Sequence, residues 1–339
     1  MKLATPRWWY TRERDARRGG MPTIRALLTP VSWVWAAVTA RRIARARPFD
    51  PGVPVICVGN LTVGGTGKTP VVRALAQRLA ARGKVVHLLS RGYGGRLKGP
   101  VRVDPAMHAA EDVGDEPLML ARDFPVWVAR DRAAGAKGAA EAGAQVIVMD
   151  DGHQNPSVLK TLSLVVVDGE TRDDEWPFGD GRVFPAGPMR ERLDAGLARA
   201  DGVTVLLPAD LPSAEPELAR MLSAVPMLSA HLAPVSSPPP GPQVGFAGIG
   251  KPWKVERALQ AAGCELADFA PFPDHRAYDE AVLRRLADRA AVFSAGLVTT
   301  EKDWVRLPAA WRTRVTPWPV QAVFDDEAAL DALLAKAGL

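Results

Sequence analysis

The residues best suited to chemistry in this sequence form a glycine-rich loop that ends in a lysine and a threonine. Gly64, Gly65 and Gly67 allow the backbone to turn sharply, so that several N–H groups can converge on phosphate oxygens. Lys68 is then placed to reach the β- and γ-phosphates, and the hydroxyl of Thr69 to bind Mg²⁺. The spacing therefore predicts a P-loop, a site for the phosphates of ATP together with Mg²⁺.

The strict form of the P-loop motif has a glycine where this sequence has Thr62. The alternative is a glycine-rich turn that binds nothing. An apolar, β-branched run at 54–59 and a helical pattern at 71–81 argue against that alternative, because a P-loop joins a strand to a helix. The residues expected to surround the nucleotide are Thr62, Gly64, Gly65, Thr66, Gly67, Lys68 and Thr69.

Two adjacent aspartates are the next candidates for chemistry. Asp150 and Asp151 follow the apolar run at 145–149, and a strand that ends in aspartate is what a Mg²⁺-associated carboxylate requires in this class. Neighbouring side chains in an extended chain point to opposite sides, so we expect one aspartate to meet the metal shell and the other a neighbour or the substrate. An ordinary acidic turn is the alternative, which the P-loop disfavours.

Short apolar runs alternate with helical stretches through the first two-thirds of the chain. This alternation predicts a doubly wound, mainly parallel α/β sheet of the P-loop NTPase type. Ligands of such sheets collect at the carboxyl ends of the strands, so the loops after the runs should border the site. The runs lie at 54–59, 85–89, 125–129, 145–149, 162–168 and 203–207.

A stretch rich in proline and serine at 234–242 predicts a semi-rigid linker. Beyond it, further strand and helix patterns predict a second, smaller α/β domain. We therefore place a P-loop kinase domain at 48–235 and the smaller domain at 236–339. The expected strands are 243–247, 296–299 and 315–324, and the expected helices are 254–262, 279–290 and 326–336.

The N-terminal segment carries most of the positive charge of the chain. Residues 1–50 hold eleven Lys or Arg and three Asp or Glu, whereas the whole chain has a net charge of only +5. Such an asymmetry suggests an anionic partner, either nucleic acid or an acidic membrane. The run at 26–40 is uncharged, has apolar residues at helical spacing and is flanked by arginines, but is too short to span a bilayer. We expect residues 1–47 to form a membrane-associating segment with an interfacial helix.

Two other interpretations of this segment stay open. A helix with one apolar face is equally typical of a helix that packs on the protein's own core. A secretory signal peptide cleaved after Ala40 is the second, but four arginines follow at once and the P-loop lies just downstream. Cys57 and Cys264 show no disulfide or metal-site pattern, which favours a reducing, cytoplasmic location.

Seven segments, taken together, resemble those of one family, the tetraacyldisaccharide 4'-kinases of lipid A biosynthesis. They run in the family's order over nearly the whole chain, and the loop with Thr62 in place of glycine is itself the family's form. Asn155 stands where we expect a histidine in that family, so we assign it no role. The segments are VGNLTVGGTGKTP (58–70), SRGYGG (90–95), GDEP (114–117), DDGHQN (150–155), RVFPAGPMRE (182–191), PDH (273–275) and TEKD (300–303).

The resemblance implies a reaction and a place. ATP would donate its γ-phosphoryl group to the 4'-hydroxyl of a tetraacylated glucosamine disaccharide 1-phosphate, giving lipid IVA and ADP. The enzyme would work at the cytoplasmic face of the inner membrane of a Gram-negative bacterium. We expect a monomer whose partners are the lipid substrate and the membrane surface, and not nucleic acid.

The resemblance also implies roles for residues outside the P-loop, beside a catalytic Lys68. Asp115 would accept the proton of the sugar hydroxyl late in the transfer. His275, which alone reads as an ordinary histidine, would pair with Asp115 in a dyad that bridges the two domains. Glu116 would either help to hold Mg²⁺ or cap the following helix. The expected metal ligands are therefore Thr69, Asp150, Asp151 and Glu116.

Four further residues are candidates for substrate contacts. Arg91 would contact phosphate and Tyr93 would pack on a sugar or acyl chain, unless their segment is only a structural turn. Arg182 and Arg190 would bind nucleotide phosphate or the substrate 1-phosphate, although arginines are often simply solvated. The segment 300–303, with Lys302 and Asp303, holds either nucleotide contacts or a helix-start ion pair.

Two other functions are compatible with a P-loop. One is a membrane-recruited ATPase that acts as a partner-binding switch, but the branch with a second lysine needs it at position 63, where this chain has Val63. The other is a soluble kinase of a small metabolite, for which the basic N-terminal segment would be dispensable.

Overall fold

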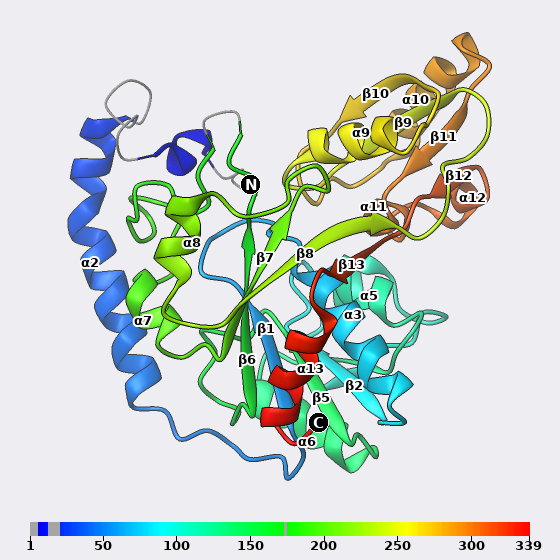
Figure 1. Ribbon diagram of the computed structural model, residues 1–339. Helices are drawn as coiled ribbons and strands as arrows, with labels where there is room; N and C mark the ends of the chain where they lie inside the picture. Colours follow the sequence, from blue (N-terminus) through cyan, green and yellow to red (C-terminus); the bar gives the residue numbers. More distant parts are fainter. Residues whose placement is uncertain (1–5, 13–20, 173–174) are drawn as a thin grey trace. The chain divides into compact units, whose positions relative to one another are not determined.

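The computed structural model describes residues 6–12, 21–172 and 175–339 (Figure 1). The chain divides into two compact units that are not continuous in sequence. The first unit consists of Met1–Arg91, Ala129–Leu232 and Ala322–Leu339, and the second of Gly92–Val128 and Ala233–Gln321. The sequence predicts continuous domains at 48–235 and 236–339 instead. The observed units differ from the predicted domains because residues 92–128 pack with the second unit and the C-terminal segment packs with the first.

The core of the first unit is a sheet in which β1 lies between β5 and β6, parallel to both. All residues of β1, β5 and β7 are buried, as expected for parallel strands that are covered on both faces. The strands of this unit follow the order β13-β8-β7-β6-β1-β5-β2. The strands are β1 (Val55–Gly59), β2 (Val86–Ser90), β5 (Val146–Asp150), β6 (Leu162–Asp168), β7 (Gly202–Leu207), β8 (Met227–Pro234) and β13 (Val320–Phe324).

Helix α3 (Lys68–Ala81) begins at the end of the glycine-rich loop and confirms the predicted order of strand, loop and helix. Its apolar stripe, Val72, Leu75 and Leu79, is fully buried. The N-cap residue is Gly67, whose φ of 78° lies in the left-handed region that favours glycine. The other helices of this unit are η1 (Arg7–Tyr10), α2 (Pro22–Ala44), α6 (Arg132–Glu141), α7 (Leu193–Leu197), α8 (Pro216–Leu222) and α13 (Glu327–Lys336).

Helix α2, the long blue helix in Figure 1, buries polar residues and exposes most of its large apolar ones. Its buried residues are polar, and they recur at an interval of seven: Arg25, Ser32 and Thr39. Its large apolar side chains face solvent instead, with Leu27 73 % and Trp33 69 % exposed. The apolar face predicted for this segment is therefore mostly exposed, although Ala36 packs against the core of the first unit. None of the described helices is both long and apolar enough to cross a membrane.

The polar stripe of α2 is seated by specific contacts within the first unit. Arg25 forms a buried ion pair with Asp180, and its guanidinium also donates to the carbonyl of Trp8. The hydroxyl of Ser32 accepts a hydrogen bond from the Ala186 amide at 3.1 Å. Buried polar groups that are satisfied in this way fix the rotation of a helix, so the apolar face is held outward.

The second unit contains a parallel sheet in the order β10-β9-β11-β12 and a short antiparallel pair, β3 and β4. The strands predicted at 243–247 and 296–299 are confirmed, whereas the pattern at 315–324 divides into β12 and the first-unit strand β13. Strand β10 went unpredicted because its half-buried residues give little apolar signal. The elements of the second unit are β3 (Val101–Arg102), α4 (Ala110–Val113), α5 (Asp115–Leu120), β4 (Val126–Val128), β9 (Gln243–Ala247), α9 (Pro252–Ala261), β10 (Leu266–Pro271), α10 (Glu280–Val292), β11 (Gly296–Thr299), α11 (Glu301–Trp304), α12 (Ala309–Arg312) and β12 (Val315–Pro317).

Candidate functional site

The glycine-rich loop occupies the carboxyl end of β1. Gly64 has a φ of 103°, and a Cβ atom on Gly67 would lie 2.5 Å from the side chain of Leu206, so both positions require glycine. A Cβ on Gly65 would meet no atom within 4 Å, so the loop is open at that point. The hydroxyl of Thr66 is buried and has no hydrogen-bond partner among the described residues. A buried polar atom of this kind suits a loop that receives an anionic ligand.

Thr62, which the sequence places in the nucleotide set, contributes its backbone to a brace. Its carbonyl accepts hydrogen bonds from the side-chain Nδ2 of Asn60 at 2.8 Å and from Nε of Arg190 at 2.9 Å. The loop 182–191 adds two backbone bonds, from Val63 to Pro188 and from Arg190 to Leu61. The segment RVFPAGPMRE thus holds the start of the P-loop from outside.

Asp151 lies among cations. Its Oδ1 accepts a hydrogen bond from Nη1 of Arg190 at 2.7 Å and lies 3.6 Å from Nζ of Lys68. Burial by itself raises the pKa of this carboxyl, but the charges of Lys68 and Arg190 outweigh burial and hold the pKa well below its usual range. Asp151 is therefore ionised at neutral pH. Asp150 is the last residue of β5 and is buried.

Sequence reasoning missed Arg132, the first residue of α6. Its side chain is buried, and it donates to the carbonyl of Ala129. Burial lowers the pKa of Arg132 to about 10, while the charges of Asp151 and Asp150 act to raise it. The guanidinium remains a cation near the two aspartates. The one available signal was its place after an apolar strand and an N-capping Asp131, which many arginines share.

The other arginines of the first unit do not join this group equally. Arg182 pairs with the buried carboxylate of Asp180, which also binds Arg25 of α2, so its place is at the seat of that helix. Arg91 is exposed directly after β2, and its charge acts on Arg132. Arg190 alone contacts both the P-loop backbone and Asp151.

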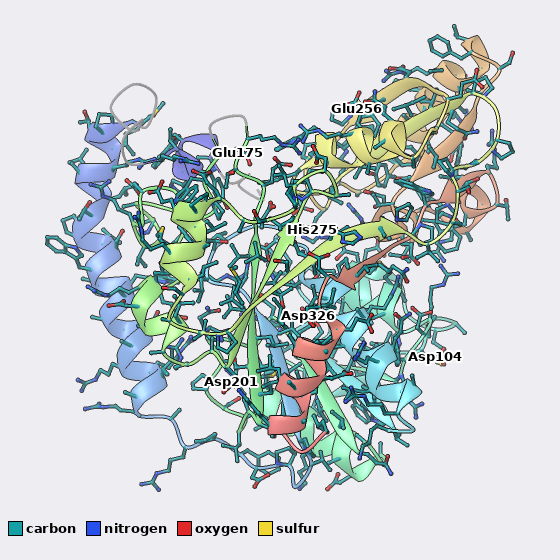
Figure 2. The ribbon with its side chains drawn as sticks, in the orientation of Figure 1. Asp104, Glu175, Asp201, Glu256, His275 and Asp326 are labelled. Atoms are coloured by element: carbon teal, nitrogen blue, oxygen red, sulfur yellow. The ribbon has the colours of Figure 1, made fainter. Side chains whose placement is uncertain are left out.

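The second unit contains the predicted pair of Asp115 and His275, and His275 is labelled in Figure 2. Nδ1 of His275 lies 2.9 Å from Oδ2 of Asp115, and since an ionised carboxylate only accepts, Nδ1 donates the proton. Asp115 begins α5 and is buried, and the ring of Tyr93 lies 5.3 Å from the His275 ring between centroids. Both dyad residues belong to one unit, so the pair does not bridge two units, because residues 92–128 pack with the second one.

Cations also surround Asp115. Burial raises the pKa of this carboxyl, but the hydrogen bond from His275 and the charge of Lys302 outweigh burial. Arg306 adds to this effect with Nε 3.5 Å from Oδ2 of Asp115. The pKa of Asp115 is consequently held well below its usual range, and the group is an ionised hydrogen-bond acceptor at neutral pH.

The side chain of Glu116 does not cap α5, and it faces a lysine. Its carboxylate lies 3.0 Å from Nζ of Lys302, which is also 3.6 Å from Asp274. Lys302 is held with a raised pKa: burial lowers it, but the charges of Glu116 and Asp115 outweigh burial. Throughout the described ranges, no three or more His, Cys, Asp or Glu residues are grouped so that they could hold a metal ion.

Comparisons with known proteins agree with the motifs. Residues 24–338 match the family described as "Tetraacyldisaccharide-1-P 4'-kinase". A protein named tetraacyldisaccharide 4'-kinase from Phenylobacterium zucineum is 73% identical over 98% of this chain and 99% of its own length. One of the same name from Caulobacter vibrioides is 67% identical over the full length of both chains.

The fold is also that of a solved structure. The crystal structure of LpxK from Aquifex aeolicus in complex with ATP matches with a TM-score of 0.72 and 25% sequence identity. The match covers 93% of this chain and 99% of that one. The P-loop-type α/β fold predicted from the sequence is thereby confirmed.

Proposed function

The chain belongs to the tetraacyldisaccharide-1-phosphate 4'-kinase family, and we propose that it transfers the γ-phosphoryl group of ATP to the 4'-hydroxyl of a tetraacyldisaccharide 1-phosphate. The observation that carries the proposal is the hydrogen bond of 2.9 Å between His275 and an ionised, buried Asp115. A nucleotide switch needs no such acceptor for a hydroxyl proton, whereas a kinase of an alcohol does.

The P-loop side supplies charge for the phosphates. Lys68 and Arg190 already face a carboxylate, and an incoming phosphate can take over these donors because charge-assisted bonds to phosphate are strong. Thr66, with its unpartnered buried hydroxyl, fits the same ligand. Mg²⁺ would be held by the hydroxyl of Thr69 and the carboxylate of Asp150, and would neutralise phosphate charge. Two protein ligands are enough for Mg²⁺, because this ion keeps waters and phosphate oxygens as its other ligands.

The Asp115 side handles the proton. Oδ2 of Asp115 is engaged by His275, whereas among the described residues Oδ1 accepts only the backbone amide of Glu116. Oδ1 is therefore the atom we assign to the sugar hydroxyl. As the bond from the 4'-oxygen to phosphorus forms and the bond to ADP breaks, the hydroxyl proton passes to Asp115. The His275 hydrogen bond orients the carboxylate for that transfer.

Helix α2 brings the enzyme to its lipid. We propose that its outward apolar face enters the cytoplasmic surface of the inner membrane, while Arg41, Arg42, Arg45 and Arg47 meet anionic headgroups. The polar contacts of α2 keep its apolar side chains exposed to water, which is unfavourable. Inserting these side chains into a bilayer removes that free-energy cost. This arrangement supports a monotopic enzyme of a lipid and disfavours the soluble metabolite kinase.

The test is to incubate the purified full chain with Mg·ATP and the disaccharide monophosphate in mixed micelles, and to measure the products by mass spectrometry. We expect one phosphate to be added per lipid, with ADP formed in equal amount. ATP hydrolysis without lipid phosphorylation would instead favour the nucleotide switch. Phosphorylation at a hydroxyl other than the 4'-position would contradict the proposed specificity.

A further inference from the structure

A second buried polar cluster lies beside the dyad within the second unit, around α11. We propose that Arg306, together with Asp303, is a positioning residue for phosphoryl transfer: it holds the backbone of His275 so that the imidazole meets Asp115. The inference rests on the proposed function, because it assigns a role in the same reaction to two residues that do not touch the reacting atoms.

The guanidinium of Arg306 donates hydrogen bonds to two backbone carbonyls next to His275. Nη2 donates to the carbonyl of Gly248 at 2.9 Å, and Nη1 donates to the carbonyl of Arg276 at 3.0 Å. The Gly248 carbonyl also accepts the amide of His275 itself at 3.2 Å. Nε donates to the carbonyl of Lys302 at 3.0 Å, which ties the same guanidinium to α11. One planar group therefore fixes the loop on which His275 stands.

Asp303 orients this guanidinium from behind. The residue is fully buried, and its Oδ1 accepts from Nη2 of Arg306 at 2.7 Å, the amide of Gly248 at 2.9 Å and the hydroxyl of Tyr278 at 2.6 Å. Its Oδ2 accepts from the hydroxyl of Thr300 at 2.6 Å. A buried carboxylate with all these partners satisfied makes a rigid network.

His275 needs such support because its backbone is in an unfavourable region. Its φ is 58°, a left-handed value that a residue with a side chain adopts only when its surroundings impose it. The backbone at Gly248 is tightly packed, because a Cβ atom there would lie 2.8 Å from the hydroxyl of Tyr278 and 3.1 Å from Asp303. If Arg306 releases the loop, His275 can relax and the bond to Asp115 is lost.

A merely structural ion pair would give a different result from a positioning pair, and a double-mutant cycle separates the two. We expect Arg306→Gln to lower kcat by about 10²-fold, the loss typical of a misplaced group, with little change in KM for ATP. In a protein that already carries His275→Ala, Arg306→Gln should lower kcat by a further factor of less than about 3, because the effects of residues that act as a unit are non-additive. Effects that simply multiply would overturn the proposal.

Arg306→Lys keeps the charge beside Asp115 but cannot bind both carbonyls at once. We expect it to remain about 10-fold slower than wild type and to show the same non-additivity with His275→Ala. It also serves in place of Arg306→Gln if that variant does not fold. Full activity of Arg306→Lys would contradict the role given to the backbone contacts. Arg284→Gln is the matched control, because Arg284 is exposed on α10 of the same unit and pairs only at the surface with Glu280 at 2.9 Å.

The outcome is separable from that of the proposed function. If the wild-type chain forms no phosphorylated lipid, the proposed function is wrong, and if Asp115→Ala keeps full turnover, the proposed base is wrong. If both behave as expected while the Arg306 and His275 effects multiply, only the positioning role is wrong.

Discussion

The two polar centres of this protein solve related problems with opposite charge. Around Asp151 the cations outnumber the carboxylates, with Lys68, Arg190 and Arg132 near two aspartates. Around Asp115 the balance is reversed, because Glu116 and Asp274 lie with it near Lys302 and Arg306. A positive centre suits phosphate and a negative one suits a hydroxyl proton, which agrees with the roles proposed for them above.

The two centres also share a backbone feature. Of the residues that the structure describes, four other than glycine have a positive φ, and Asp151 at 53° and His275 at 58° are two of them. Left-handed backbone at residues with side chains costs about 1–3 kcal/mol and is retained where function needs a particular geometry. In one centre Arg190 binds the strained Asp151 directly. In the other, Arg306 binds the Gly248 carbonyl, which also accepts the amide of the strained His275.

The largest expected effect comes from a substitution in the positive centre around Asp151. Lys68→Met removes the cation that faces Asp151 and, as we propose, the terminal phosphates. We expect kcat/KM to fall by about 10³-fold, in the range for loss of a preorganised donor. Steady-state kinetics with Mg·ATP checks this, and Lys84→Met, at an exposed lysine after α3, is the control. Catalysis that survives in the Lys68 variant would rule out a phosphate role for the loop.

The next effect breaks the negative centre. Asp115→Ala should lower kcat by about 10²-fold or more, the contribution of a general base, with little change in affinity for ATP. Single-turnover assays and nucleotide binding measured separately distinguish the two quantities. Asp288→Ala, an exposed aspartate on α10 of the same unit, should leave both unchanged. Turnover near the wild-type level in the Asp115 variant would remove the base from the mechanism.

These two centres were predictable to different degrees. The P-loop was readable because its glycines, Lys68 and Thr69 are contiguous, and backbone geometry follows from local sequence. Asp115 and His275 are 160 positions apart, so only resemblance to a family could pair them. Arg132 and Arg306 were not predictable, since nothing in their type or spacing distinguishes them from the other arginines. Which side chains a buried arginine faces depends on packing that no single segment encodes.

Helix α2 teaches the same lesson at the level of a whole element. Its helical periodicity was visible in the sequence, but periodicity does not say which face is buried. The polar residues Arg25 and Ser32 face inward only because Asp180 and Ala186, distant in sequence, supply partners. The split of the run at 315–324 into two strands went unpredicted for the related reason that strand pairing is non-local.

A third prediction concerns membrane binding. Replacing Leu27, Trp33 and Val34 of α2 by serine removes exposed apolar area, so partitioning to anionic vesicles should fall by about 10²-fold. The folded core should be unaffected, because these side chains contact solvent. Vesicle sedimentation checks the result, and Val292→Ser, at a residue 79 % exposed in the second unit, is the control. Unchanged sedimentation would show that α2 is not the membrane contact.

A fourth prediction uses pH to compare Asp115 with its neutral isostere. The pKa of Asp115 is depressed in the folded state, so its charge stabilises the protein above the unfolded-state pKa of about 4 and loses that effect as pH falls toward the folded pKa. The melting temperature of wild type should therefore exceed that of Asp115→Asn by a constant amount from pH 5 to 8. The gap should narrow only below about pH 4. A gap that closes near pH 6 would mean that the carboxyl is not ionised as described.

The smallest expected effect is that of Arg182, which lies in the same loop as Arg190. Arg190 contacts the P-loop backbone and Asp151, whereas Arg182 is half-exposed and pairs with Asp180, a carboxylate that keeps Arg25 as a partner. Arg190→Gln should therefore reduce kcat/KM by about 10²-fold. Arg182→Gln should change it by less than about 3-fold, since an exposed ion pair contributes about 1 kcal/mol or less. Measuring both in one assay isolates position from residue type, and equal losses would place Arg182 in the substrate site after all.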